Sequence, residues 1–267
     1  MRDFIIRRSY LYAIVVLIII LVVIGLAIAA QNNGGGKTAL TSYDNKPVPN
    51  GLLNMLMIPD NISNSIGPGT ATSSGIIQIN NKSLLMADGK PEVLYIGAEF
   101  CPYCAAMRWP MIIALSRFGT FSNLHLMTSS STDTPPSVPT YTFYNSTYTS
   151  NYITFVSVET TTNVESVPLQ KPNASEGALF AEYNPGGGIP FLLFANKSVL
   201  LGSTYLPQET IAGANWSVTA ASLHNASSLQ AQAIIGSANL ITAEICKADG
   251  NEPANVCSQP YVTQAGA

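Results

Sequence analysis

Charged side chains are scarce in this sequence. Lys, Arg, Asp and Glu make up 10% of its 267 residues, whereas about 25% is usual in soluble domains. After Arg8 the basic residues stand singly along the chain, so no face is basic enough to follow a phosphate backbone. We therefore expect no nucleic-acid partner and a surface wetted mainly by Ser, Thr and Asn.

Metal-ligating side chains are also few. The chain has two histidines, His125 and His224, and four cysteines. Neither histidine stands at zinc-finger spacing from a cysteine, which disfavours a structural zinc site. We expect no metal and no other cofactor. The cysteines fall into two pairs with none left over, as is usual in an oxidising compartment.

One uncharged, strongly apolar stretch covers residues 10–30. Its length of about 20 residues is what a helix needs to cross a bilayer. Because Arg2, Arg7 and Arg8 precede it and no comparable basic cluster follows, the positive-inside rule places residues 1–9 in the cytoplasm. We expect a single-pass protein of the cell membrane whose C-terminal domain is extracytoplasmic.

Two export signals are alternatives to a retained anchor. Ala27-Ile28-Ala29 matches the small-x-small pattern before a cleavage site, and Arg7-Arg8 faintly resembles a twin-arginine signal. Each of them also exports the rest of the chain. Seven N-x-S/T triplets after the apolar stretch agree with export as candidate glycosylation sites. They begin at Asn61, Asn81, Asn145, Asn173, Asn196, Asn215 and Asn225.

Composition divides the exported part into segments. Residues 31–50 carry three consecutive glycines and two prolines, which is typical of a flexible tether. We expect a domain over 51–245 and a tail over 246–267. Within the domain, 128–172 is dominated by Ser, Thr, Tyr, Asn and Pro. It is interpreted as an insertion with its own hairpin or lobe and with one convincing strand, 152–158.

Strand and helix patterns follow one another and predict an α/β domain. Apolar runs bounded by turn residues predict strands over 76–79, 84–87, 92–98, 124–127, 189–194 and 198–201. Helices are expected over 101–118, 176–183 and 217–247, with a short helix or docking segment over 52–58. Pro110 is expected to bend the first helix, and Gly236 to interrupt the last long one.

The first cysteine pair, Cys101-Pro102-Tyr103-Cys104, stands where a predicted strand ends and a helix begins. Unpaired amides and the helix dipole at that position stabilise a thiolate, so the pKa of Cys101 is expected to be low. Cys104 lies one turn further on and can close a disulfide with Cys101. The pair can therefore cycle through attack, mixed disulfide and resolution.

The residues from Tyr95 to Cys104, Tyr-Ile-Gly-Ala-Glu-Phe-Cys-Pro-Tyr-Cys, resemble the active-site segment of the thioredoxin superfamily. Downstream, Gly188-Ile189-Pro190-Phe191 is similar to that family's cis-proline segment. The resemblance covers about 75–201 and implies a thioredoxin-like central sheet flanked by helices. It also implies a cis Pro190 and an Ile189 backbone that binds a cysteine-containing peptide; an ordinary trans turn before a strand is the alternative for Pro190. As a whole, the chain resembles uncharacterised archaeal membrane-anchored thioredoxin-like proteins.

The sequence departs from the family in two places. Thioredoxins carry a buried acid six residues before the first cysteine, and here that position is Tyr95, so proton transfer from Cys104 is expected either to be slow or to use another group. Phe100 replaces the usual tryptophan and is expected to cover the sulfurs and, with Pro102 and Tyr103, to line the substrate site. Glu99 is expected to be a solvated surface residue, with a functional role near the cysteines as the alternative.

Cys246 and Cys257 enclose ten residues that include Gly250 and Pro253. A disulfide between them is expected to act as a structural staple that ties the last helix to the tail. A second redox pair acting in relay with the first is the alternative interpretation.

These features favour a membrane-anchored thiol:disulfide oxidoreductase. Its expected partners are cysteine-containing exported proteins and a membrane redox protein that recharges the pair. A redox-inert surface or binding module, with both cysteine pairs as staples, is the alternative from another class. The basic and apolar N-terminus would also suit a pilin-like filament subunit, although nothing after Gln31 supports one.

Overall fold

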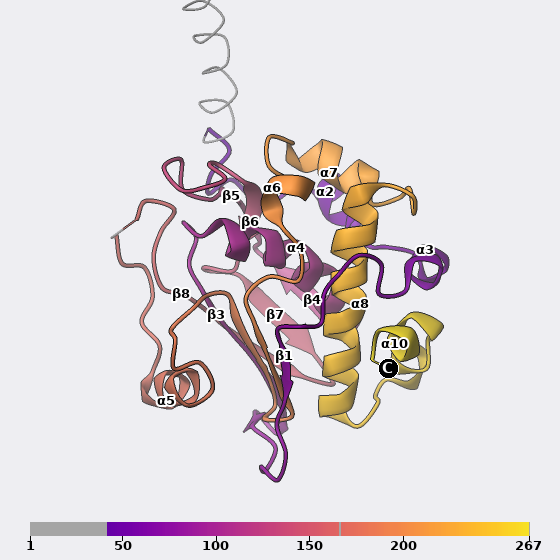
Figure 1. The fold of residues 1–267 in the computed structure, drawn as a ribbon. Helices are drawn as coiled ribbons and strands as arrows, with labels where there is room; N and C mark the ends of the chain where they lie inside the picture. The colour runs from indigo at the N-terminus through magenta and orange to yellow at the C-terminus, as the bar shows by residue number, and fades with distance from the viewer. Residues whose placement is uncertain (1–41, 166, 267) are drawn as a thin grey trace, which may run out of the picture. The chain divides into compact units, whose positions relative to one another are not determined.

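The computed structural model describes residues 42–165 and 167–266 (Figure 1). The expected cytoplasmic N-terminus, the transmembrane stretch and most of the tether, residues 1–41, lie outside the described residues. Of the helices in the described ranges, none is both long enough and apolar enough to span a bilayer.

A mixed six-stranded sheet lies at the centre of the domain (Figure 1). Its strands are β1 (Ile76–Gln78), β2 (Met86–Ala87), β3 (Lys90–Gly97), β8 (Thr154–Glu159), β9 (Phe191–Phe194) and β10 (Ser198–Leu201). β3 pairs parallel with β8 and antiparallel with β9, while its first residues pair with β2. β10 forms a hairpin with β9, and β1 completes the sheet along β10. All six were predicted as strands close to these bounds, and β8 corresponds to the strand expected over 152–158.

Helices cover both faces of this sheet (Figure 1). α5 (Ala174–Tyr183) packs Leu179 and Phe180 against the core formed by β3, β8 and β9. On the other side, α4 (Pro102–Leu115) and α8 (Leu229–Asp249) pack against each other, and α8 also contacts β3 and β9. Because successive side chains of β3 point to opposite faces, both of its faces are buried. This is the arrangement expected of an uninterrupted apolar strand.

α4 begins directly at the first cysteine pair. Cys101 is its N-cap, and Pro102 occupies the first helical position, where the missing N–H of proline costs nothing. Alanine, methionine and isoleucine make up about half of the rest of the helix, and every residue except Tyr103 is buried. Pro110 lies inside α4, which continues to Leu115. The N-terminus of a fully packed helix therefore holds the cysteines in place.

The segment 128–172 differs from the expected insertion. It contributes β8 to the central sheet, directly beside β3. Before β8, two small antiparallel pairs form from β4 (Gly119–Ser122) with β7 (Thr147–Ser150) and from β5 (His125–Thr128) with β6 (Pro139–Thr142). One aromatic cluster is formed by Phe121, Phe143, Tyr148 and Phe155, whose rings meet edge-to-face, stacked or tilted. Threonine and tyrosine suit strands despite their polarity, which is why this segment does not behave as a loop.

The expected tether does not extend as far as residue 50. Val48 is buried, and the backbone N–H groups of Asn45 and Val48 donate to the carbonyls of Leu126 and Leu124. Tyr43 also packs against the ring of Trp216. Residues 43–50 therefore belong to the domain, because their backbone groups pair with the edge formed by β5.

The C-terminal helical region also differs from the prediction. α7 (Trp216–Ser222) and α8 are separate helices, and α8 runs through Gly236 without interruption. A Cβ at Gly236 would collide with the backbone carbonyl of Pro68, so glycine there permits a close approach of two backbones. The remaining helices are α2 (Asn50–Met55), α3 (Asp60–Ile66), α6 (Pro207–Thr210), α9 (Ala254–Cys257) and α10 (Pro260–Ala265).

Candidate functional site

The two sulfurs of the first pair differ in their surroundings. Both cysteines are free thiols and both are buried, but Cys101 retains 6% exposure whereas Cys104 has none. The backbone N–H of Cys104 donates to Cys101 Sγ at 3.3 Å. Cys101 thus faces the N-terminus of α4 near the surface, and Cys104 lies beneath it.

The surroundings shift the two thiol pKa values in opposite directions. Hydrogen bonds from Cys104 lower the pKa of Cys101, against the effect of burial, and the positive charge of Arg108 adds to the lowering. Burial raises the pKa of Cys104 well above its ordinary value, and its hydrogen bond to Cys101 raises it further. An outer thiolate and an inner thiol are the two protonation states that sequential attack and resolution require.

The chain segment at Ile189 and Pro190 comes back to this sulfur pair. The Ile189–Pro190 peptide bond is cis, and the thiol of Cys101 donates to the Ile189 carbonyl at 3.9 Å. Pro190 is buried and directly precedes β9, while Gly186, Gly187 and Gly188 before it are exposed. The structure therefore brings together Cys101, Cys104, Ile189 and Pro190 from two distant parts of the chain.

Three further residues were expected to line the substrate site. Tyr103 is 38% exposed beside the cysteines, whereas Pro102 is buried and Phe100 is half-buried. The Phe100 carbonyl accepts a hydrogen bond from the N–H of Ser130 at 2.8 Å. Of the three, Tyr103 presents the largest exposed fraction to a partner.

Glu99 corrects the expectation of a solvated surface residue. It is only 3% exposed, and the Thr142 hydroxyl donates to its carboxylate at 2.5 Å. Burial raises the pKa of Glu99, and the nearby Glu159 carboxylate raises it further. The strand pairs that follow β3 cover this side chain, a contact that local sequence does not reveal.

Sequence reasoning also missed a buried ion pair behind the cysteines. Arg108 on α4 and Glu159 at the end of β8 are both fully buried. Arg108 Nε and Nη2 donate to the two carboxylate oxygens of Glu159 at 2.8 and 2.7 Å, and Nη2 also donates to the Ala98 carbonyl at 2.7 Å. An arginine four residues after Cys104, within an otherwise apolar helix, was the available signal.

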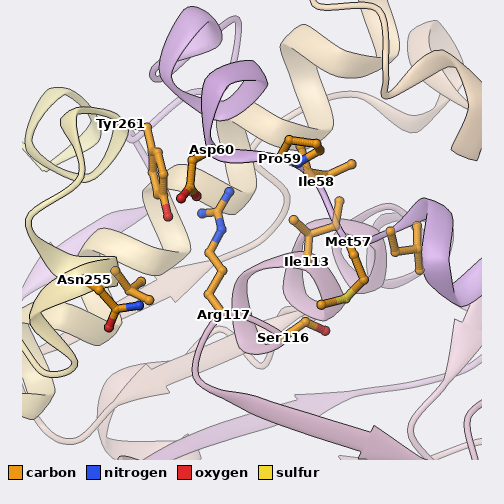
Figure 2. A pocket seen from close by; sticks show the side chains of 11 residues that line it. Met57, Ile58, Pro59, Asp60, Ile113, Ser116, Arg117, Asn255 and Tyr261 are labelled. Atoms are coloured by element: carbon orange, nitrogen blue, oxygen red, sulfur yellow. The ribbon is translucent and has the colours of Figure 1, made fainter.

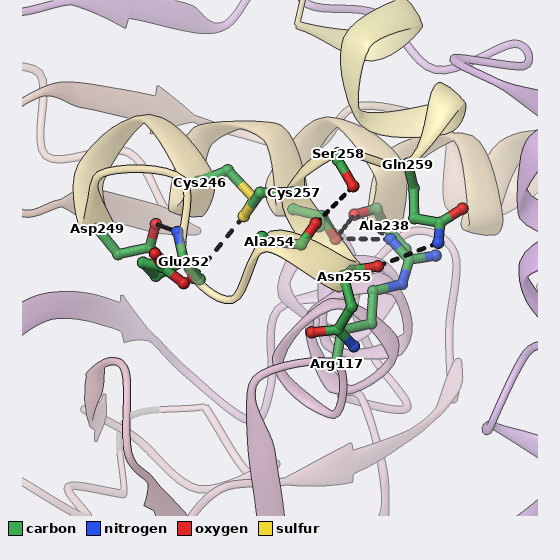
Figure 3. The surroundings of a disulfide bond; sticks show 11 residues. Arg117, Ala238, Cys246, Asp249, Glu252, Ala254, Asn255, Cys257, Ser258 and Gln259 are labelled. Atoms are coloured by element: carbon green, nitrogen blue, oxygen red, sulfur yellow. Dashed lines mark hydrogen bonds between the residues drawn. A yellow bond between two sulfur atoms is a disulfide. The ribbon is translucent and has the colours of Figure 1, made fainter.

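The second cysteine pair lies elsewhere in the domain. Cys246, near the end of α8, and Cys257, in α9, are joined in a disulfide (Figure 3). The loop between them is anchored by the N–H of Glu252, which donates to the Asp249 carboxylate at 3.1 Å. Both cysteines are buried. This pair is built as a brace between α8 and the tail.

The candidate glycosylation sites lie largely on the surface. Asn61, Asn81, Asn145, Asn173, Asn215 and Asn225 are exposed. Asn196 is half-buried in the turn between β9 and β10, and its Nδ2 donates to the Ser83 carbonyl at 3.2 Å. Because a glycan is attached through this nitrogen, Asn196 is the least accessible acceptor of the seven.

A pocket of about 270 Å³ opens at the other end of α4 (Figure 2). Met57, Ile58, Asp60, Arg117 and Tyr261 are among its lining residues. The guanidinium of Arg117 lies 4.3 Å from the centre of the Tyr261 ring. Its donors bind Ser63 Oγ, Asn239 Oδ1 and Thr242 Oγ1. Since a helix of 14 residues spans about 20 Å, this pocket is separate from the cysteine pair.

Comparison with known proteins gives one similarity. Residues 76–183 match the model of a family described as Domain of unknown function (DUF929). No curated protein and no solved structure matches the chain. The matched range begins at β1 and ends with α5, so it contains both cysteines of the first pair and stops before Ile189. The chain is thus similar to that family over the strand and helix that carry Cys101 and Cys104.

Proposed function

We propose that this chain is a membrane-anchored, extracytoplasmic thiol:disulfide oxidoreductase of thioredoxin-like fold. The observation that carries the proposal is the asymmetry of the sulfur pair: Cys101 is slightly exposed at a helix N-cap and its pKa is lowered, while Cys104 is fully buried and its pKa is raised. Two cysteines that serve only as a staple have no need of such a difference.

The proposed reaction proceeds in two exchanges. In the reducing direction, the Cys101 thiolate attacks a substrate disulfide, forms a mixed disulfide and releases one substrate sulfur as a thiolate. Cys104 then loses its proton and attacks Cys101 Sγ. The second substrate sulfur leaves and is protonated, and the Cys101–Cys104 disulfide forms. The oxidising direction is the reverse of these steps, so a membrane redox partner must restore the starting state in either case.

The order of elements supports the thioredoxin-like part of the proposal. A central strand leads into the cysteines and α4, β8 returns parallel to that strand, and the β9–β10 hairpin continues the sheet on the other side. The Ile189 carbonyl, just before β9, lies within reach of Cys101 Sγ. A backbone carbonyl at this place is suited to pair with an extended substrate segment next to its cysteine.

The proposed location rests on three features. The apolar stretch 10–30 follows three arginines in the sequence. The Cys246–Cys257 disulfide is typical of an oxidising compartment. Six of the seven sequons are on exposed positions. The substrates that fit this location are exported proteins that contain cysteine.

Insulin reduction and refolding of a reduced, denatured substrate test the proposed activity. The purified protein should catalyse at least one of them. Cys101→Ser should abolish turnover, and Cys104→Ser should stop it while trapping a Cys101-linked mixed disulfide. As a control, Tyr152→Phe, which alters an exposed tyrosine, should leave the rate unchanged. Activity that survives in Cys101→Ser would disprove the proposal.

Thiol alkylation at varied pH separates this function from a redox-inert module. After mild reduction, Cys101 should react with iodoacetamide along a titration curve whose midpoint lies below that of an ordinary thiol. A pair that resists mild reduction, or an ordinary midpoint at Cys101, would support the structural-staple alternative.

A further inference from the structure

Three buried polar side chains lie behind the sulfurs, and we call them the Tyr95–Arg108–Glu159 cluster. Each has 0% exposure. Glu159 receives two hydrogen bonds from Arg108, which leaves Arg108 Nη1 without a partner. Tyr95 Oη is also buried without a partner. Two strong donors are therefore unpaired at one place inside the protein.

The chain geometry places these donors next to Cys104. Arg108 follows Cys104 by four residues on α4, so the two side chains share one face of the helix. On β3, Tyr95 extends over Gly97, where a Cβ would collide with its Oη. Gly97 in turn pairs in register with Glu159. The absence of a side chain at Gly97 lets the phenol reach the end of β3, where the sulfur pair and the ion pair meet.

An unpaired buried donor is costly while its neighbours are neutral, but it gains an acceptor when a nearby group becomes an anion. Burial raises the pKa of the Tyr95 phenol well above its ordinary value, and the nearby Cys104 and Cys101 sulfurs also raise it. Arg108 keeps its charge: burial opposes ionisation, but Glu159, Tyr95 and Cys104 raise its pKa well above the ordinary value. Both groups therefore stay protonated as donors while Cys104 ionises.

We propose that Arg108 and Tyr95 are positioning residues which stabilise the Cys104 thiolate during resolution of the mixed disulfide. The proposal rests on the function proposed above. In this step Cys104 loses its proton, its sulfur bonds to Cys101 Sγ, and the bond from Cys101 to the substrate sulfur breaks. The departing sulfur takes up a proton, so no further oxidant or reductant is required. Because both donors stay protonated, they stabilise the Cys104 anion but do not take its proton, which is balanced by the proton that the departing sulfur takes up.

Few ionisable groups surround Cys104, so the pH dependence of its reaction can be assigned to particular residues. Cys101 and Arg108 face it from α4, Tyr95 from β3, and Glu159 from the end of β8 through its pair with Arg108. Glu99, with a raised pKa, also lies near Arg108 and Glu159. Substitution of Tyr95 by phenylalanine removes one hydroxyl and leaves every charged group in place.

The test follows resolution directly in the full chain, purified in detergent with the Cys246–Cys257 bridge intact. An aromatic disulfide reagent that releases a coloured thiolate reacts first with Cys101 and releases one equivalent. Cys104 then attacks the mixed disulfide and releases a second. Stopped-flow absorbance over a range of pH gives the rate and the pH midpoint of each phase.

The variants are Tyr95→Phe, Arg108→Lys and the control Tyr141→Phe. Tyr141 is equally buried and its Oη is also unpartnered, but its pKa is raised by burial alone, with no influence from the sulfurs. In Tyr95→Phe the second phase should slow by about tenfold, with its midpoint raised by about one pH unit. Arg108→Lys should act in the same direction, and Tyr141→Phe should match the wild type. Near-ultraviolet circular dichroism checks the folding of each variant.

The outcomes separate the two proposals. If the wild type releases two equivalents and Tyr95→Phe leaves the second midpoint unchanged, the cluster is only structural and this inference is overturned. The test does not depend on whether Arg108→Lys folds, because the second-phase midpoint of Tyr95→Phe alone decides between the two outcomes. If the wild type releases one equivalent or reacts like an ordinary thiol, the proposed function itself fails.

Discussion

Removal of the Cys246–Cys257 brace should lower stability by an amount that the loop length sets. The bond joins residues separated by 11 positions, and the chain-entropy relation for a loop of that length gives about 2.8 kcal/mol at 25 °C. Both cysteines are buried, so the suitable variant is Cys246→Ala with Cys257→Ala, which adds no buried hydroxyl. For a compact unit that spans residues 43–267, this loss corresponds to a fall in Tm of about 5–10 °C.

Thermal and urea denaturation of the purified chain measure this effect. Strong reductant should lower the wild-type Tm to that of the double variant and leave the variant itself unchanged. The matched control is Cys101→Ala with Cys104→Ala, which removes two buried thiols and keeps the Cys246–Cys257 bridge, so strong reductant should lower its Tm by as much as it lowers that of the wild type. A double variant within about 0.5 kcal/mol of the wild type would refute the loop-closure reasoning.

Three other changes follow from the packing and charges. Gly236→Ala should destabilise the protein by about 2 kcal/mol or more, because the new methyl group meets the Pro68 backbone and this clash outweighs the usual gain for alanine in a helix. Urea denaturation measures the change, and a variant more stable than the wild type would contradict the close contact. Burial raises the pKa of Asp249 to about 7, so its contribution to stability is present below pH 4 and is lost as the pH rises through 7. After allowance for the partial exposure of Asp249, this contribution to the free energy of unfolding amounts to roughly 1–2 kcal/mol. Asp249→Asn should therefore flatten the plot of unfolding free energy against pH, and a variant whose plot runs parallel to that of the wild type would count against this assignment. Arg108→Met and Glu159→Gln should each lower the free energy of unfolding by about 3–5 kcal/mol, because each leaves a buried charge or donor unpaired. The double variant should lose far less than the sum of the two. Additive losses in urea denaturation would exclude strong coupling between the two residues.

The central part of the fold could be predicted from local patterns. The apolar run of β3, the hairpin of β9 and β10, the helix that begins after Cys101 and the short helix α5 all coincide with strong local signals. Each of these elements has apolar residues at its own period and turn or capping residues at its ends. Asn173 and Glu176, for example, form a capping box at the start of α5.

The remaining elements depend on contacts between distant residues. The polar strands β6 and β7 are stable because their aromatic side chains pack across to Phe121 and Phe155. Residues 43–50 are ordered because they pair with the edge at β5. Gly236, which weakens a helix in isolation, is required by the neighbouring Pro68 backbone. In each case a tertiary contact outweighs the local preference.

The candidate site shows the same division. The CxxC spacing identifies Cys101 and Cys104, and the resemblance adds Ile189 and Pro190. Nothing local to Glu159 indicates that it pairs with a residue 51 positions away. Glu99 was expected on the surface because a carboxylate normally lies there, and only the strands that follow β3 cover it. Charged groups behind the sulfurs are therefore visible only in three dimensions.

The scarcity of charge makes the buried pair more informative. In the described ranges three ion pairs form, and two of them, Lys82–Glu182 and Lys247–Glu244, have at least one exposed partner. Of these three pairs, only Arg108–Glu159 has both side chains fully buried. Replacing such a pair by apolar residues of similar size is often neutral or stabilising, since the desolvation of both charges offsets their attraction. A chain that otherwise uses few charges gains little stability from this one. Its position one helical turn from Cys104, with a guanidinium nitrogen left unpaired, is better explained by what happens when the inner sulfur becomes an anion.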